Sequence, residues 1–420
     1  MLIHSASQLI TLTAEAQRGS RLGELNIIPD GAVLLEGESI AEVGRSRDLL
    51  ARFAHEEKLD ARGRVVMPGF VDPHTHLVWA GSRAAEFEMR LQGKSYLEIM
   101  QAGGGIQSTV NVSRAAAGAD LLRQTRLRAQ TIFQHGTTTA EAKTGYGLEL
   151  ESELKQLSVL LELDAENRLE IIPTFLGAHA IPAEFRDQEQ AYVELLCSRM
   201  LPALRDWWAQ HAAGKPLPFV DVFCEKGAFS LEQSRQVLET AKSLGFPLKI
   251  HADEFENLGG AALAAELGAA SADHLVTTSM DDIRQLAQSD TVAVSLPLTP
   301  FGLAEAEYSP ARRIIQSGAI FALASDLNPG TAWCGNMQFV LAVACRYMRL
   351  TPAEALAAAT INAAAAIREQ QRLGSVHAGK QADLLILSIS DYRDLAYRFG
   401  VNLVDVVIKK GQVFSSHTQP

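Results

Sequence analysis

The chain has 420 residues, of which 47% are hydrophobic and 21% are charged, proportions typical of a globular protein. Its formal net charge of −11 argues against nucleic acid or an anionic membrane as a partner. A small anionic substrate remains compatible with a local basic pocket. The length suits one large barrel with a small accessory domain.

The cysteine content and the N-terminus indicate the compartment. The four cysteines include no Cys-x-x-Cys pair, which is typical of a reducing environment and not of a disulfide framework. The first residues lack a basic region followed by an apolar core, and no apolar run reaches the length of about 18 residues that a membrane helix needs. We therefore expect a cytoplasmic protein.

The two ends of the chain have a strand-and-turn pattern. Residues 1–64 contain short apolar runs separated by turn residues, which predicts a small antiparallel β unit. An alanine-rich helix is expected over residues 353–370, and strands are expected again over 382–387 and 404–413. Residues 1–64 and 371–420 are thus predicted to form one composite β-sandwich domain from both termini.

Residues 65–370 alternate between apolar strand-like runs and amphipathic helices, which is typical of parallel βαβ units. Eight such units predict an α/β fold of the (β/α)8 TIM-barrel type. A doubly wound open sheet is the alternative, but no Gly-x-Gly-x-x-Gly follows the first run. The runs are residues 65–71, 137–142, 170–176, 219–223, 248–252, 272–275, 291–296 and 320–325, and helices are expected over 120–135, 151–166, 231–244 and 281–288.

Candidate metal ligands lie at the ends of the first, fifth and eighth runs. His74 and His76 are two residues apart, so an extended strand points both imidazoles to one face. Catalytic groups of (β/α)8 barrels lie at the C-terminal ends of the strands, where His251 and Asp326 also fall. Alone, His251 could be a core histidine and Asp326 a turn residue. Together, three imidazoles and a carboxylate suit Zn²⁺ or Fe²⁺ with a position open for water.

Acid–base candidates lie near the same strand ends. Glu254, three residues after His251, is our candidate general base and proton shuttle, although it could be a solvated loop carboxylate. His274 could orient water or polarise a carbonyl group, or it could simply pack at the barrel rim. Asp273 is an alternative for that role.

Further residues are candidates for substrate binding. Arg83 lies in a predicted loop after His76 and could pair with a substrate carboxylate, with Arg90 as the alternative. The glycines at 103–105 do not form a phosphate loop, because no strand precedes them and no Gly-Lys-Ser/Thr follows; a mobile lid or a tight turn fits better. Possible hydrogen-bonding partners of a substrate are Tyr146, His179, Asn328, Gly330 and Thr331, each of which could also be an ordinary rim residue.

Several segments carry a resemblance to a known family. Residues 68–76, PGFVDPHTH, resemble the first-strand signature of the amidohydrolase superfamily. Further segments resemble the branch that hydrolyses 4-imidazolone-5-propanoate to N-formimidoyl-glutamate in histidine degradation, and the resemblance extends over essentially the whole chain. These segments are GGGIQSTV at 103–110, EAKTGYGL at 141–148, HADEF at 251–255, SADHL at 271–275 and SDLNPG at 325–330.

The resemblance implies a role for each candidate. His74, His76, His251 and Asp326 would bind the metal, Glu254 and His274 would act in catalysis, and Arg83, Tyr146, His179, Asn328, Gly330 and Thr331 would contact the substrate or product. It implies one divalent or trivalent ion per subunit, zinc or iron. Relatives with two metals carry a carboxylated lysine at the end of the fourth strand, and Lys226 falls one residue too late.

Two other functions remain open at this stage. A cytosine or guanine deaminase of the same superfamily would share the metal ligands, but Arg83 and Tyr146 favour a substrate with a flexible carboxylate. A non-catalytic scaffold would be expected to lack at least one ligand. We expect a homodimer, the commonest state of soluble enzymes that form oligomers.

Overall fold

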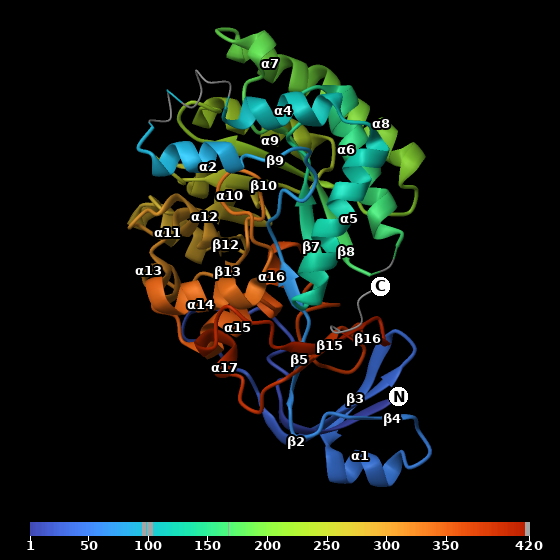
Figure 1. The fold of residues 1–420 in the computed structure, drawn as a ribbon. Coiled ribbons are helices and arrows are strands. Elements are labelled where there is room, and N and C mark those ends of the chain that lie inside the picture. Colours follow the sequence, from blue (N-terminus) through green and yellow to red (C-terminus); the bar gives the residue numbers. More distant parts are fainter. Residues whose placement is uncertain (95–97, 99–103, 167, 416–420) are drawn as a thin grey trace.

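The computed structural model describes residues 1–94, 98, 104–166 and 168–415. Its centre is a barrel of eight strands in which each strand runs parallel to the next in chain order (Figure 1). The predicted (β/α)8 fold is confirmed. The barrel strands are β6 (Phe70–Asp72), β7 (Thr137–Lys143), β8 (Glu170–Ala178), β9 (Phe219–Cys224), β10 (Lys249–Ala252), β11 (Ser271–His274), β12 (Val292–Ser295) and β13 (Phe321–Leu323).

The barrel closes just beyond the ends of β6 and β13. Thr75 and Leu327 form a parallel bridge there. The backbone N–H of His76 donates to the Leu327 carbonyl at 2.9 Å, and that of Asp326 donates to the His74 carbonyl at 3.1 Å. The residues that complete the ring are therefore neighbours of the candidate metal ligands, or the ligands themselves.

The second sheet combines strands from both termini, as predicted. Figure 1 shows the blue N-terminal and red C-terminal strands side by side below the barrel. The sheet is mixed and not antiparallel, because β4 and β5 run parallel to β1. In the order β16-β15-β14-β5-β1-β2-β3, with β4 also paired to β1, it contains β1 (Leu2–Leu9), β2 (Ile28–Glu36), β3 (Ser39–Arg45), β4 (Lys58–Asp60), β5 (Val65–Pro68), β14 (Leu384–Leu387), β15 (Val404–Lys409) and β16 (Gln412–Ser415).

The apolar run 65–71, expected as one strand, is divided between the two sheets. β5 pairs with β1 and β14 in the terminal sheet, whereas β6 pairs with β7 in the barrel. Gly69 lies at the division, where an added Cβ would come within 2.4 Å of the Thr138 side chain. The close approach of the Thr138 side chain to the backbone at residue 69 therefore requires glycine.

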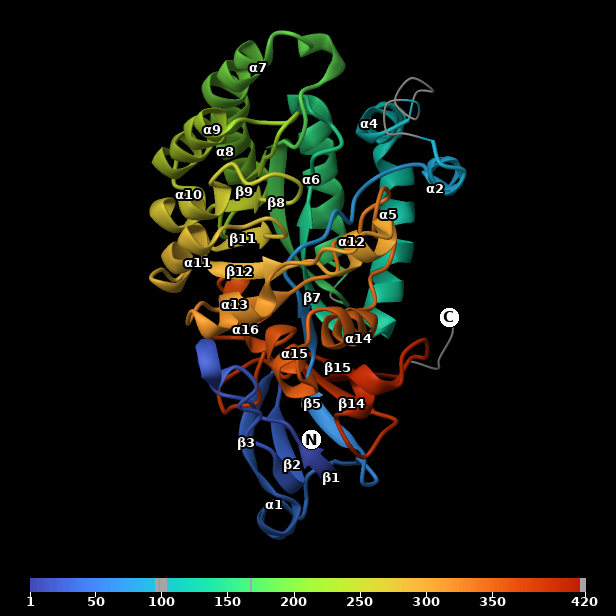
Figure 2. The same cartoon turned by 90° about the vertical axis from the view of Figure 1, so that its left-hand side faces the viewer.

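Helices surround the barrel, and Figure 2 shows α8, α9, α10 and α11 along one side and α5 and α14 along the other. Within the described residues, no helix has the length and apolarity to cross a membrane. The helical segments are η1 (Gly19–Arg21), α1 (Ser46–Arg52), α2 (Ala84–Leu91), α4 (Ile106–Ala115), α5 (Gly118–Gln134), α6 (Leu150–Asp164), η2 (Ala183–Phe185), α7 (Glu189–Leu195), η3 (Leu196–Met200), α8 (Leu201–His211), α9 (Leu231–Ser243), α10 (Gly260–Leu267), α11 (Met280–Ala287), α12 (Leu298–Leu303), α13 (Ala311–Gln316), α14 (Met337–Tyr347), α15 (Pro352–Ala358), α16 (Ile361–Ala366) and α17 (Asp394–Tyr397).

The prediction of one helix over residues 353–370 is wrong. The chain forms α15 and α16 there, separated at Thr360, whose backbone has φ −130° and ψ −92°. The Thr360 hydroxyl donates to the Leu356 carbonyl at 2.7 Å. Such a side-chain bond competes with the helical backbone pattern and accompanies the break.

Candidate active site

Four candidate ligands from three parts of the barrel converge on one point. The Nε2 atoms of His76 and His251 are 3.3 Å apart. The Oδ1 atom of Asp326 lies 3.5 Å from His74 Nε2 and 3.6 Å from His76 Nε2. The structure thus brings together His74, His76, His251 and Asp326, as the sequence predicted from the strand ends.

These atoms fit a metal ion. His74 Nε2 and Asp326 Oδ1 are buried and have no hydrogen-bond partner among the residues that the structure describes, a costly state unless another group contacts them. Ligands held at about 2.0–2.2 Å from a tetrahedral ion lie about 3.3–3.6 Å from one another, which is the spacing found here. The same geometry leaves zinc and iron equally suitable.

Asp326 is oriented by a residue that the sequence analysis missed. The Thr299 hydroxyl donates to Asp326 Oδ2 and so leaves Oδ1 to face the histidines. Burial raises the pKa of Asp326 to about 6. Thr299 follows β12, the seventh barrel strand, for which no site residue was predicted. The strand-end rule could have found it.

Two buried aspartates orient the imidazoles from behind. Asp273 Oδ2 lies 2.6 Å from His74 Nδ1. Asp221 Oδ2 lies 3.0 Å from His251 Nδ1, a contact that is less well aligned than a hydrogen bond. With the Nδ1 proton of each ring facing a carboxylate, the Nε2 lone pair is directed toward the cluster. Asp221 was not predicted as a site residue. Asp273 was considered as an alternative to His274 for orienting water, but it contacts His74 instead.

Glu254 and His274 lie together beside the cluster. Glu254 Oε2 is 3.7 Å from His274 Nε2, and the His274 side chain is buried while that of Glu254 is largely so. Burial and the charge of Asp326 raise the pKa of Glu254 well above its usual value. Burial also lowers the pKa of His274 well below its usual value. A neutral imidazole and a carboxyl group with a raised pKa form a pair suited to proton transfer. His274 also lies close enough to His74 and His251 to be a possible ligand.

Arg83 reaches the loop that follows Asp326. Its guanidinium group contacts Glu86 Oε2 at 2.8 Å. A Cβ added at Gly330 would lie 2.4 Å from Arg83 Nη1, so only glycine allows this approach. Arg90, the alternative carboxylate-binding residue, donates to the Gly330 carbonyl at 2.9 Å. Both arginines therefore converge on Gly330.

His179 and Tyr146 line the other side of His76. The His179 ring stacks on that of His76 with centroids 4.8 Å apart, and the Tyr146 ring lies 5.9 Å from His76. His179 Nδ1 is 2.9 Å from the Gly145 carbonyl, which can only accept, so Nδ1 carries the proton and Nε2 is left as an acceptor. Burial lowers the pKa of His179 to about 3. His179 is thus neutral at physiological pH.

Asn328 shapes the loop that carries Gly330 and Thr331. Its Oδ1 accepts from the backbone N–H groups of Gly330 and Thr331, each at 2.8 Å. Its Nδ2 donates to the Asp326 carbonyl at 2.7 Å and to the Thr331 hydroxyl at 2.9 Å. Asn328 is thus engaged within the loop, and its contact with substrate stays a prediction.

Two further expectations concern residues away from the cluster. Lys226 is exposed and pairs with Glu256 at 2.6 Å, so it does not reach the cluster as a second metal ion would require. The predicted lid at 103–105 begins at Gly103, which lies outside the described residues, and α4 begins directly after Gly105.

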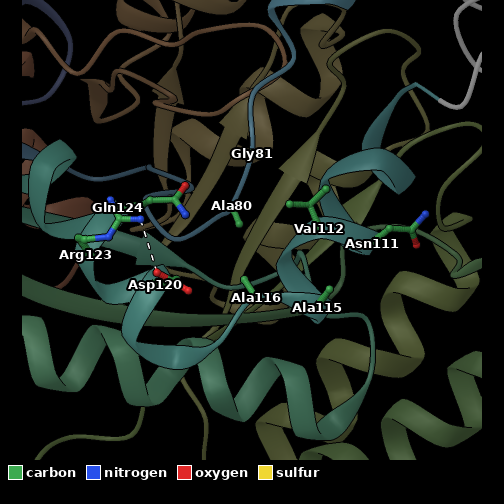
Figure 3. Close-up of a pocket in the computed structure, with 9 residues that line it drawn as sticks. All are labelled: Ala80, Gly81, Asn111, Val112, Ala115, Ala116, Asp120, Arg123 and Gln124. Atoms are coloured by element: carbon green, nitrogen blue, oxygen red, sulfur yellow. Dashed lines mark hydrogen bonds and ion pairs between the residues drawn. The ribbon is translucent and has the colours of Figure 1, made fainter.

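A separate hollow of about 600 Å³ lies between α4 and α5 (Figure 3). Asp120 and Arg123 pair with each other there at 3.5 Å, so neither charge is directed at a ligand. It contains none of the predicted site residues. Its lining consists of Ala80, Gly81, Asn111, Val112, Ala115, Ala116, Asp120, Arg123 and Gln124.

Substitution of Gly330 by alanine is expected to displace the Arg83 guanidinium group, because the new methyl group would occupy its position. Loss of one charge-assisted hydrogen bond to a carboxylate should raise KM about tenfold or more. Gly118→Ala is the matched control, since a Cβ there meets no atom within 4 Å. Steady-state kinetics of both variants test the effect, and equal KM values would contradict it.

Comparison with known proteins supports the class that this barrel and cluster suggest. Residues 65–414 match the model of the amidohydrolase family, and the chain therefore belongs to that family. The structure also resembles a triazine hydrolase variant (TM-score 0.75, 15% identity, 99% of this chain and 94% of that one). It resembles 5-methylcytosine deaminase from Klebsiella pneumoniae as well (TM-score 0.72, 16% identity, 100% and 99%). At such low identity, these structures establish the fold alone.

Sequence relatives place the chain more narrowly. It is 50% identical to the imidazolonepropionase of Herpetosiphon aurantiacus, over 98% of this chain and 96% of that protein. It is 49% identical to that of Chloroflexus aggregans, over 98% of each chain. Within the amidohydrolases, the chain is thus a member of the imidazolonepropionase family, and the resemblance seen in the sequence is confirmed.

Proposed function

We propose that the chain hydrolyses the cyclic amide bond of 4-imidazolone-5-propanoate to give N-formimidoyl-L-glutamate. The observation that carries the proposal is the convergence of unpartnered Nε2 and Oδ1 atoms beside Glu254 and His274, in a chain 42–50% identical to proteins named for this activity. No feature of the site calls for the deaminase alternative.

The metal centre would consist of His74, His76, His251 and Asp326. A zinc or iron ion held there would supply Lewis acidity, which polarises a carbonyl group and lowers the pKa of water. The protein's own contribution is an ordered set of donors: Thr299 and the two aspartates behind the imidazoles fix the rings and the carboxylate before any ligand binds. Such preorganisation avoids reorganisation during the reaction.

Glu254 would move the proton. Water adds to the ring carbonyl carbon, the C–N bond breaks, and the departing nitrogen must gain a proton. Glu254 accepts the proton from water and delivers it to that nitrogen, and His274, 3.7 Å away, keeps the carboxylate in place or polarises the carbonyl group. Neutral His179 offers Nε2 as an acceptor to a ring N–H.

Arg83 would bind the propanoate group. In the structure its guanidinium group is held by Glu86, so a substrate carboxylate must compete with an internal one. Tyr146, Asn328, Gly330 and Thr331 complete the proposed contacts. An arginine fork is the usual partner for a carboxylate.

Arg83→Ala is expected to raise KM by at least about tenfold, the scale of a charge-assisted hydrogen bond, with a smaller change in kcat. A substrate with a carboxamide in place of the carboxylate should have a similarly high KM with the wild type and with the variant. Arg90→Ala should have the smaller effect if Arg83 is the principal contact. A larger increase in KM for Arg90→Ala than for Arg83→Ala would assign the principal carboxylate contact to Arg90.

The decisive experiment is an assay of the purified protein on 4-imidazolone-5-propanoate, with identification of the product and measurement of bound zinc and iron. Formation of N-formimidoyl-glutamate with about one metal ion per chain is expected. Ammonia release from cytosine or guanine without turnover of the imidazolone would overturn the proposal.

We further propose a cytoplasmic homodimer that acts on a small carboxylate substrate, without nucleic-acid or membrane partners. The four cysteines are unbonded, as is typical of a reducing compartment. Sedimentation of the purified protein measures the oligomeric state.

A further inference from the structure

Lys143, the last residue of β7, is fully buried close to the histidine cluster, and the proposed reaction does not use it. Its Nζ atom lies 2.7 Å from Glu141 Oε1 and 2.8 Å from Asp221 Oδ2. Asp273 Oδ2 is farther away, at 3.9 Å. A buried ammonium group is costly unless carboxylates compensate it, and three do so here.

Each of these three carboxylates also contacts the ligand-bearing part of the barrel. Asp221 and Asp273 use the oxygen atom nearest Lys143 to contact the Nδ1 atoms of His251 and His74, as described above. Glu141 Oε2 accepts from the backbone N–H of Thr75 at 3.2 Å, and the Thr75 hydroxyl donates to the Glu141 carbonyl at 2.7 Å. Thr75 lies between the two histidines of the first strand.

We propose that Lys143 is a positioning residue for the metal centre, because its ammonium group holds the three carboxylates that orient the ligand histidines and the backbone between them. The inference rests on the metal centre of the proposed function and adds a residue that touches neither metal nor substrate. Its predicted effect is on metal affinity and coordination geometry.

Charge explains why an ammonium group is needed at this place. Among the described ion pairs of these three buried carboxylates, Lys249 would be the remaining lysine partner without Lys143, and its Nζ lies 3.4 Å from Asp273 Oδ2. Carboxylates crowded in this way repel one another unless a cation lies between them. Carboxylates that move apart lose their contacts with the imidazole N–H groups, so the rings would lose the orientation that directs Nε2 toward the ion.

Lys409 in β15 provides a matched control. It is buried to a similar extent, and its Nζ atom lies 2.7 Å from Asp383 Oδ2 and 2.9 Å from Glu170 Oε2. Among the described contacts, neither of those carboxylates touches a ligand histidine. Replacing Lys409 therefore removes a buried lysine with two carboxylate partners without disturbing the proposed metal centre.

The experiment compares Lys143→Met, Lys409→Met and the wild type in three measurements: zinc release to a competing chelator, the visible absorption of the cobalt-loaded protein, and thermal unfolding of the metal-free protein. We expect Lys143→Met to bind zinc about 10- to 100-fold more weakly and to show an altered cobalt spectrum. Lys409→Met should lower the unfolding temperature but keep the zinc affinity and the spectrum.

Two outcomes overturn the inference: unchanged zinc affinity and cobalt spectrum in Lys143→Met, or the same loss of zinc affinity in both variants. Absence of stoichiometric metal in the wild type would instead overturn the proposed metal centre. If Lys143→Met does not fold, the double variant Lys143→Met/Glu141→Gln removes one negative charge together with the ammonium group. It should still bind zinc weakly, and wild-type affinity in it would refute the role of Lys143.

Discussion

Replacement of Glu254 by glutamine is expected to lower kcat at least about a hundredfold, the usual scale for a general acid–base group. The amide keeps the size of the side chain but cannot accept or deliver the proton. Because Glu254 is not one of the four proposed ligands, metal content and thermal stability should stay close to those of the wild type. Steady-state kinetics and metal analysis of the same preparation measure both.

Glu256→Gln is the matched control for this substitution, since Glu256 lies two residues away and pairs with Lys226 at the surface. It should turn over substrate normally.

The pH dependence of the reaction is a second test of Glu254. Burial raises the pKa of Glu254, so kcat/KM should rise with pH through a value above the pKa of an ordinary glutamate. Glu254→Gln should not show this rise of kcat/KM with pH. Near-normal turnover by this variant would show that Glu254 is not the general base.

Asp326→Ala is expected to lose the bound metal and, with it, measurable activity. Removal of a ligand should weaken metal binding by more than about a hundredfold, beyond the effect of a residue that only orients a ligand. Thr299→Val is the matched control, because it deletes the hydroxyl that donates to Asp326 Oδ2 and leaves the ligand itself in place. Its loss of affinity should be smaller, about tenfold.

The metal-free forms give a test of Asp326 that does not depend on activity. Burial raises the pKa of Asp326 to about 6 in the folded protein, above the value of about 3.9 for an unfolded aspartate. The folded state then binds the extra proton, so Asp326 lowers the free energy of unfolding as pH rises between these two values. Metal-free Asp326→Ala should lose less stability than the metal-free wild type over this range. If the free energy of unfolding changes with pH by the same amount in both proteins, Asp326 is not the group that titrates in this range.

Hydrophobic periodicity and strand-end position were enough to predict the barrel and the place of its site. His74 and Asp326 follow two strands and His251 lies near the C-terminal end of a third, and parallel strands bring their C-terminal ends to one rim. The run 65–71 could not be divided from sequence, because both halves are fully buried and equally apolar. The close contact at Gly69 lies at the point where the chain leaves the terminal sheet and enters the barrel.

Residues that act through other residues were harder to find. Lys143 directly follows the expected run 137–142 and Asp221 lies within the expected run 219–223, so neither position alone indicates a role at the metal centre. Their roles depend on distances across neighbouring strands, which no spacing along the chain encodes. Arg83 lies in a loop, as predicted, but its pairing with Glu86 follows from the start of α2, whose position the sequence did not define.

Closure of the barrel has a consequence for the order of events during biosynthesis. Asp72 and Ser325, which hydrogen-bond across the junction of the first and last strands, are 253 residues apart. A loop of that length closes late and at an entropic cost. The proposed ligand set therefore cannot exist on a partly synthesised chain, since Asp326 arrives with the last barrel strand. Uptake of the ion would follow ring closure and would then stabilise the closed ring in proportion to the free metal concentration.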